Sequence, residues 1–172
     1  MLFRSMKDRV LEIIESILAG FIDMRCPEKT HPSQYDWVNL ESDILTQFGV
    51  RIRTEQLREL DRRQAEGEIQ EQLLKRYEEK EAMIGAELMR ETERMIMLNV
   101  IDNQWKDHLL SMDHLKEGIG MRAYGQKDPL IEYKKESFIL FQDMMDRIED
   151  ETVRFLFFLQ RQDEVEIGRA HV

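Results

Sequence analysis

Apolar residues recur through most of the chain at alternating steps of three and four, the spacing of one face of an α-helix. The clearest stripe in the C-terminal half contains Ile101, Trp105, His108, Met112, Leu115 and Ile119. A second stripe contains Phe138, Phe141, Met145, Ile148, Thr152 and Phe155. We therefore expect two helices, over about 85–119 and 130–160, that pack against each other as an antiparallel hairpin. The residues expected in this contact are Trp105, Met112, Phe138 and Phe141.

Glycine and proline residues separate the two stripes. Gly118 and Gly120 weaken the first helix, and Gly125 can take a positive φ. Pro129 cannot continue a helix but can begin one. The turn of the hairpin is therefore expected within 120–129.

The N-terminal half shows shorter helical segments. A first helix is expected over about 4–23, and because no N-cap precedes its pattern, we expect the chain to begin inside a helix of a longer protein. A loop rich in proline follows, and then a short helix over 37–50 that Gly49 ends. Thr54 is expected to open another helix, and Gly67 to break it.

Residues 68–119 contain no proline and read as helical throughout. One continuous helix over this range would be about 75 Å long at 1.5 Å per residue, longer than a small domain, so it would serve as a spine for other parts. Gly85 is expected to mark a bend or a close helix contact within it. The predicted fold is all-α, with long scaffold helices, a small helical insert and a two-helix finger.

Composition and charge agree with a helical protein. The chain has 172 residues, of which 35% are charged, with only 8 Gly and 3 Pro, and this length suits one ordinary domain or two small ones. The formal net charge of -10 argues against nucleic acid as a partner. Arg122, Lys127, Lys134 and Lys135 nevertheless make the turn net positive. This basic turn could meet an anionic surface or an acidic cleft, or simply be solvated.

The cysteine content and the apolar runs indicate a location. Cys26 is the single cysteine, which excludes an internal disulfide and suits a reducing compartment. The sequence has no secretory signal and no apolar run of about 20 residues that would span a bilayer. We expect a soluble, cytoplasmic chain.

No motif for catalysis or metal binding is convincing. Gly120 and Gly125 have the spacing of a phosphate-binding loop, but Lys127 comes one position late and no strand precedes it. His108 and His114 are six residues apart on a helix and so face different ways, which argues against a shared metal. His108 is expected to be a core histidine. We expect neither an active site nor a metal site.

The stretch WKDHLLSMDHLKEGIGMRAYGQKDPLIEYKKESFILF, residues 105–141, resembles the helical scaffold and two-helix finger of the SecA family, the motor ATPases of bacterial protein export. Met121 departs from the usual leucine, a conservative change at an apolar position. The strong resemblance covers about 85–150, and 1–84 resembles the family more loosely. It implies three parts: the end of a first scaffold helix over 1–20, a helical wing over 21–84, and the scaffold with its finger over 85–172.

The resemblance also implies roles for the finger. In the family the finger tip enters the SecYEG channel and a tip tyrosine, here Tyr124, touches the polypeptide being moved. The tip residues implied to contact the channel are Met121, Arg122, Gln126, Lys127 and Asp128. The residues implied to restrain the ATPase are Lys116, Gly118, Ile119, Arg122 and Tyr124. The wing would help to wall the clamp that holds the preprotein.

The same resemblance places the motor elsewhere. The Walker motifs and the preprotein cross-linking domain would lie upstream of Met1, so this chain is expected to be no enzyme and to hold no cofactor, with ATP and Mg confined to the motor domains. Its implied partners are the SecYEG channel, preproteins, the SecA motor domains and, through the whole protein, an anionic membrane surface. The implied location is the cytoplasm, at the periphery of a bacterial inner membrane. Exposed apolar surfaces could also cause self-association.

Two other interpretations remain open. One is a free-standing helical scaffold or adaptor that binds partner helices, for which Tyr124 and the basic tip would be dispensable. The other is an enzyme with an unrecognised site, which would need a deep pocket with perturbed titratable groups.

Overall fold

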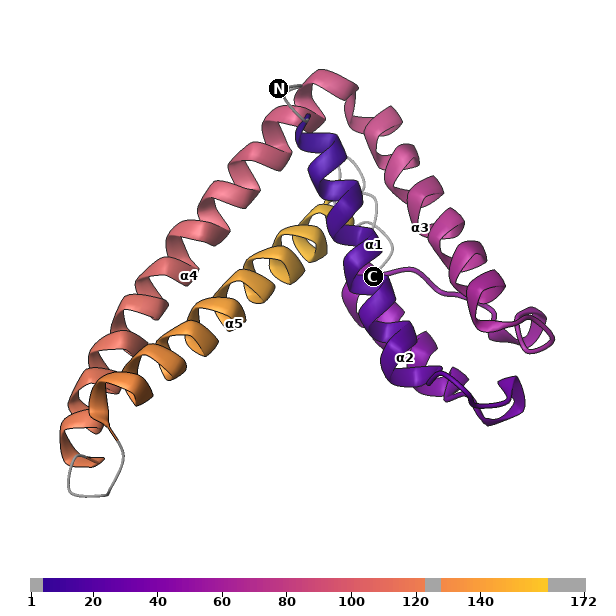
Figure 1. The fold of residues 1–172 in the computed structure, drawn as a ribbon. Coiled ribbons are helices and arrows are strands. Elements are labelled where there is room, and N and C mark those ends of the chain that lie inside the picture. Colours follow the sequence, from indigo (N-terminus) through magenta and orange to yellow (C-terminus); the bar gives the residue numbers. More distant parts are fainter. Residues whose placement is uncertain (1–4, 123–127, 161–172) are drawn as a thin grey trace, which may run out of the picture. The chain divides into compact units, whose positions relative to one another are not determined.

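The computed structural model describes residues 5–122 and 128–160, although not the side chain of Arg122. The α-helices are α1 (Met6–Arg25), α2 (Trp37–Phe48), α3 (Arg62–Ile84), α4 (Ala86–Arg122) and α5 (Pro129–Phe157), and two short 3-10 helices are η1 (Pro32–Gln34) and η2 (Thr54–Gln56) (Figure 1). These described ranges contain no strand. The prediction of an all-α fold is confirmed.

The ends of α1 and α2 follow from local chemistry. The side chain of Ser5 accepts a hydrogen bond from the backbone N–H of Asp8, and the Asp8 side chain bonds the N–H of Ser5 in return. This capping box begins α1 at Met6, so the expectation of an uncapped start at about residue 4 is wrong. Gly49 ends α2 in the left-handed region with φ 63°, as predicted, because glycine takes this conformation without a steric penalty.

The expected positions of two helix boundaries around α3 are wrong. Thr54 opens only the short η2, and α3 begins at Arg62, where the Asp61 side chain caps the N–H of Gln64. Gly67 lies inside α3 and does not break it. A single glycine costs a helix only about 1 kcal/mol, and the burial of Ala65, Ile69 and Leu73 on the same helix outweighs that cost.

The expected continuous helix over 68–119 is also wrong, because Gly85 separates α3 from α4. Gly85 has φ 96° and ψ 138°, a conformation outside the helical region. Its N–H still bonds the carbonyl of Glu81, so α3 ends with a satisfied backbone donor. A new helix then starts at Ala86, and the chain changes direction at the glycine.

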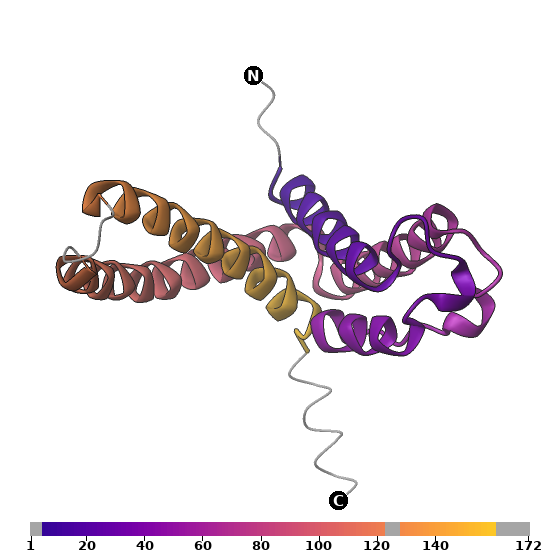
Figure 2. The same cartoon turned by 60° about the horizontal axis from the view of Figure 1, so that its bottom comes forward.

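The structure divides into two compact units, residues 1–94 with 153–172 and residues 95–152. In the first unit α1 packs against both α2 and α3 (Figure 2). The largest side chains of its core are fully buried, and they are Ile13, Ile14, Leu18, Ile22, Leu40, Ile44, Phe48, Ile69, Leu73, Tyr77 and Met89.

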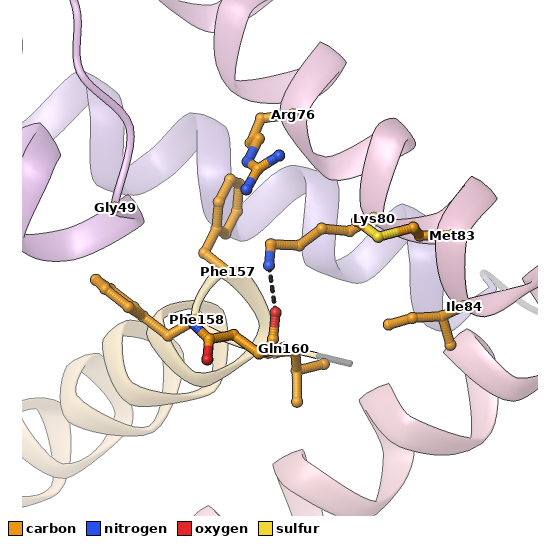
Figure 3. Close-up of a pocket in the computed structure, with 9 residues that line it drawn as sticks. Gly49, Arg76, Lys80, Met83, Ile84, Phe157, Phe158 and Gln160 are labelled. Carbon is orange, nitrogen blue, oxygen red and sulfur yellow. Dashed lines mark hydrogen bonds between the residues drawn. The ribbon is translucent and has the colours of Figure 1, made fainter. Parts of the chain in front are cut away.

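The C-terminal end of α5 completes this core. The ring of Phe157 lies 5.0 Å from that of Phe48 and 5.9 Å from that of Tyr77, measured between centroids. Beside it is a pocket of about 280 Å³ between α3 and the α5 end, where the buried ammonium of Lys80 donates a 2.6 Å hydrogen bond to the carbonyl of Leu159 (Figure 3). A cation near the last carbonyls of a helix is favourable, so Lys80 helps to anchor this end.

Candidate functional site

The second unit is a hairpin in which α4 and α5 run antiparallel. Its apolar seam contains Val100, Met144 and Ile148, with Ile96 packed beside them. Farther along α4, the amide of Gln104 donates to Glu151 at 3.0 Å and accepts from the guanidinium of Arg147 at 2.9 Å. These polar contacts fix the two helices in one register, because they satisfy groups that the hairpin partly buries.

The buried face of the hairpin agrees with the predicted stripes at His108, Ile119, Ile148 and Thr152, and differs from them at the positions nearest Val100 and Met144. On α4 the side chains at the seam are Val100, Gln104, His108 and Ile119, all buried, whereas Ile101 and Trp105 are exposed. On α5 Ile148 and Thr152 are buried as expected, but Met144 takes the place predicted for Met145. Phe138 is 64% exposed and stands outside the seam.

Three rings nevertheless bridge the seam at its edge. The imidazole of His108 lies 5.5 Å from the ring of Trp105 and 6.1 Å from that of Phe141, centroid to centroid. Trp105 remains 46% exposed and Phe141 41% exposed, while His108 is buried. His108 is therefore a packed residue of the hairpin, as expected, and Met112 is half-buried. The hydrogen bond to a neighbour that is expected of a core histidine is not seen, because its buried Nδ1 has no partner within the described residues.

One side of the hairpin carries an exposed apolar surface. Its residues on α4 are Leu98, Ile101, Trp105 and Leu109, and those on α5 are Phe138, Phe141 and Met145. Successive residues of a helix are rotated by 100° about its axis, so on each helix these residues lie about a quarter turn from the seam residues, in the same rotational direction. Because α4 and α5 are antiparallel, the same rotation on both helices places the two sets on the same side of the hairpin. We call these seven residues the apolar face of the finger.

The structure describes only the flanks of the finger tip. Helix α4 continues through Gly118 and Gly120 to Arg122, with Ile119 buried, Lys116 exposed and Met121 82% exposed. Asp128 begins α5, as its carboxylate accepts from the N–H of Leu130 at 2.9 Å. Tyr124, Gln126 and Lys127 lie outside the described residues, and so does the side chain of Arg122.

A partly buried charged cluster near Gly85, within the first unit, was not predicted. Arg90 on α4 pairs with Glu81 of α3 and with Glu93, and Lys7 of α1 pairs with Glu81 at 2.9 Å. The hydroxyl of Tyr77 donates to Glu93, whose side chain is fully buried. No local pattern reveals this cluster, because Lys7, Tyr77 and Glu93 come from three separate helices.

The electrostatic state of the cluster follows from its burial. Burial raises the pKa of Glu93, against the lowering effect of Tyr77 and Arg90. The pKa of Glu81 is lowered, first by its hydrogen bond with Lys7 and then by Arg90. Burial and the bond to Glu93 raise the pKa of Tyr77, so its phenol stays protonated as a donor. The cluster links α1, α3 and α4 through its ion pairs and the Tyr77 hydrogen bond.

Within residues 5–122 and 128–160, no group of three or more His, Cys, Asp or Glu side chains is arranged to hold a metal ion. No helix in the same ranges is both long and apolar enough to cross a membrane.

Comparison with known proteins identifies the architecture. The family described as SecA Wing and Scaffold domain matches residues 1–160. The Protein translocase subunit SecA of Solibacter usitatus is 59% identical over 154 residues, which are 90% of this chain and 16% of that protein. The subunit of the same name from Acidobacterium capsulatum is 48% identical over 153 residues, 88% of this chain and 15% of that protein.

The chain thus spans about a sixth of the length of the curated relatives it matches. The long α4, the hairpin that it forms with α5, and the unit that contains α1, α2 and α3 are the parts to which this match applies. The chain belongs to the SecA family, of which it carries the wing and scaffold domain.

Proposed function

We propose that this chain is the mechanical and regulatory part of a SecA protein-export motor. In this role the scaffold packs against the motor domains, the finger tip enters the SecYEG channel, and Tyr124 contacts the translocating preprotein. The observation that carries the proposal is the two-helix finger of a SecA-family scaffold, with residues 105–141 carrying the family's characteristic stretch. The whole protein would work in the cytoplasm, at the periphery of the inner membrane.

The finger's construction supports a role in contacting other proteins. Its seam is held by both apolar packing and the polar contacts of Gln104, so the two helices form a stiff arm. The apolar face of the finger leaves large side chains such as Trp105 and Phe138 in solvent. Exposed apolar patches of this kind mark interaction sites, and the motor domains are the partner we propose for it.

The tip suits contact with many polypeptide sequences. A tyrosine offers a broad apolar face and one hydroxyl, so Tyr124 can hold a chain without reading its sequence. Met121, exposed on the last turn of α4, adds a flexible apolar contact beside it. Arg122, Gln126, Lys127 and Asp128 are proposed to contact the channel loops.

The finger is also proposed to restrain ATP hydrolysis through Lys116, Gly118, Ile119, Arg122 and Tyr124. Lys116 faces solvent and is free to meet the motor, whereas Ile119 faces α5 and would act by holding the arm straight. ATP and Mg would bind the motor domains, so the chain needs no cofactor of its own for this role.

The experiment is ATP turnover by a purified SecA motor fragment that lacks its own wing and scaffold, with increasing amounts of this chain. A saturable fall in turnover is expected, and Lys116→Glu should weaken it. Lys75→Glu, the same charge reversal at an exposed site on α3, should leave the fall unchanged. If the chain binds the motor but turnover stays constant, the finger does not act as a brake in trans.

A free-standing adaptor remains the second candidate, favoured only by the exposed apolar face. It predicts that replacing Tyr124 leaves the function of the whole protein intact.

A further inference from the structure

A segment outside the helices and turns, whose last residue Arg53 has extended backbone with φ -102° and ψ 97°, has features that the finger's function does not use. It joins α2 to η2 and consists of Val50, Arg51, Ile52 and Arg53. Arg51 and Arg53 are exposed, whereas Ile52 and the following Thr54 are buried. This alternation is the side-chain pattern of a β-strand.

Both ends of the segment are held in place. Gly49 turns the chain out of α2 at φ 63°. At the other end, the carboxylate of Glu41 on α2 accepts hydrogen bonds from the N–H of Thr54, at 2.9 Å, and from its hydroxyl. The segment is therefore preorganised in its extended form, which reduces the entropy cost of binding a partner.

The backbone of this segment is unpaired. Within the described part of the chain, no hydrogen bond involves a backbone N–H or C=O of the four residues 50–53. An extended stretch with free backbone donors and acceptors is a template on which another strand can pair.

A groove runs along the segment on the side of α2. It measures about 680 Å³ and lies between residues 51–53 and the outward face of α2, which contributes Val38, Glu41, Ser42 and Leu45. Val38 is 72% exposed, so the groove offers apolar contact to an incoming side chain. A groove between a helix and an unpaired extended segment is the geometry in which peptides bind by strand addition.

The charge of the groove selects the kind of peptide. Neither Arg51 nor Arg53 makes an ion pair in the part of the chain that the structure describes, although the chain as a whole carries a net charge of -10. The carboxylate in the groove, that of Glu41, is already bonded to Thr54. Two unpaired guanidiniums two residues apart in an extended segment match carboxylates at alternate positions of a neighbouring strand.

We propose that α2 and Val50–Arg53 form a binding groove for an extended peptide whose carboxylate and apolar side chains alternate. The peptide pairs with the backbone of the segment as a strand, presents its carboxylates to Arg51 and Arg53, and places apolar side chains against Val38 and Leu45. This site lies on the wing and is independent of the finger tip.

The test uses the 172-residue chain and a fluorescein-labelled ten-residue peptide of alternating Glu and Val, followed by fluorescence anisotropy. Saturable binding is expected, and a peptide of alternating Lys and Val should bind at least about tenfold more weakly. The double variant Arg51→Gln with Arg53→Gln should weaken binding of the Glu–Val peptide by about tenfold or more. Arg63→Gln, which removes one exposed charge from α3 outside the groove, should change it by less than about twofold.

The backbone part of the proposal has its own test. Methylation of alternate amide nitrogens on the edge of the Glu–Val peptide that faces the segment removes strand pairing without changing its side chains. It should weaken binding at least about tenfold, and the unmethylated peptide should slow amide hydrogen exchange at residues 50–53. Circular dichroism verifies that each variant keeps its helix content.

Three outcomes would overturn the proposal. They are no saturable binding of the Glu–Val peptide, equal binding of the Glu–Val and Lys–Val peptides, and unchanged binding by the double arginine variant. Retained binding of the methylated peptides, whichever edge is methylated, would overturn strand addition. None of these results depends on ATP turnover or on Tyr124, so they are separable from the test of the finger.

Discussion

The hydroxyl of Tyr77 on α3 donates a hydrogen bond to the buried carboxylate of Glu93 on α4, across the helix break at Gly85. Arg90 meets the same carboxylate at 2.7 Å. A carboxylate removed from water is costly unless it is both paired and hydrogen-bonded. These two partners allow the contact between α3 and the first turns of α4 to be built around a buried acid.

Removing the hydroxyl should therefore weaken the corner. Tyr77→Phe keeps the buried ring but leaves Glu93 without its phenol donor, and we expect a loss of about 1 to 3 kcal/mol in the free energy of unfolding. Urea denaturation followed by circular dichroism measures it. The matched control is Tyr35→Phe, because the Tyr35 hydroxyl makes no hydrogen bond within the described residues. Equal stability of the two variants would show that the buried bond contributes nothing.

The ion pair between Lys7 and Glu81 should give a pH-dependent contribution. The folded-state pKa of Glu81 is below its ordinary value of 4.5, so the pair stabilises the fold above that pH. The stabilisation is lost as pH falls through the lowered folded-state pKa. Lys7→Met should cost about 1 kcal/mol at neutral pH, and its difference from the unmodified chain should shrink in acid.

The measurement is the free energy of unfolding of both proteins from pH 7 down to about pH 3. Glu93, whose pKa is raised, has the opposite pH dependence, with its contribution lost as pH rises. The comparison isolates Glu81 because both proteins keep Glu93. A difference that stays constant over the whole range would contradict the assigned pairing.

Two glycines should respond in opposite directions to the same substitution. Gly67→Ala lies inside α3, where an added Cβ meets no atom within 4 Å, and should stabilise the chain by about 0.5 to 1 kcal/mol. Gly85→Ala also has space, but φ is 96° there, and the strain should cost about 1 kcal/mol or more. Thermal unfolding of both variants checks this. Stabilisation by Gly85→Ala would mean that α3 and α4 can join as one helix.

Adjacent methionines test the register of the finger. Met144 is 2% exposed in the seam, while Met145 lies on the apolar face. Met144→Ala should cost about 2 to 5 kcal/mol, whereas Met145→Ala should cost less than about 0.5 kcal/mol. Amide hydrogen exchange within residues 95–152 reports the stability of this unit by itself. The reverse order would restore the originally predicted stripe.

Tyr124 tests the proposed contact with the preprotein. In the complete SecA protein, Tyr124→Ala should slow translocation several-fold without a change in thermal stability, because the apolar face of the side chain is lost. Tyr124→Phe should be mild, since most of that face remains. Translocation of a model preprotein into vesicles that contain SecYEG measures both. Equal activity of the three proteins would favour the adaptor interpretation.

Local chemistry explains why much of the fold was predictable. Gly49 ends α2 and Pro129 begins α5 where expected, because glycine permits the left-handed φ of a helix end and proline fixes a φ that suits a helix start, irrespective of distant contacts. This reasoning failed for Gly67, which lies inside α3, and it was incomplete for Gly85, where a bend was expected and the structure separates α3 from α4. Gly67 and Gly85 both lie in polar sequence of helical pattern, so the local sequence does not distinguish them. They differ in their tertiary surroundings, because the ion pair of Arg90 with Glu81 lies near Gly85 and not near Gly67.

In the finger, too, some features were predictable from the sequence and others were not. The family was recognisable because the stretch 105–141 is specific. The residues that face inward could not be predicted, because Val100 and Ile101 are apolar neighbours, and so are Met144 and Met145. Both possible stripes have helical spacing, and the choice between them depends on the facing helix.

The sequence by itself therefore determined the helical class, the two-helix finger and the SecA family, since periodicity and short specific motifs are local properties. Only the tertiary structure decided the full break between α3 and α4 at Gly85, the partners of Glu93 and the inward face of the finger. Each of these depends on contacts between residues distant in the chain, such as Lys7 with Glu81 and Gln104 with Arg147. Such contacts act through burial and pairing in space, and no spacing along the chain records them.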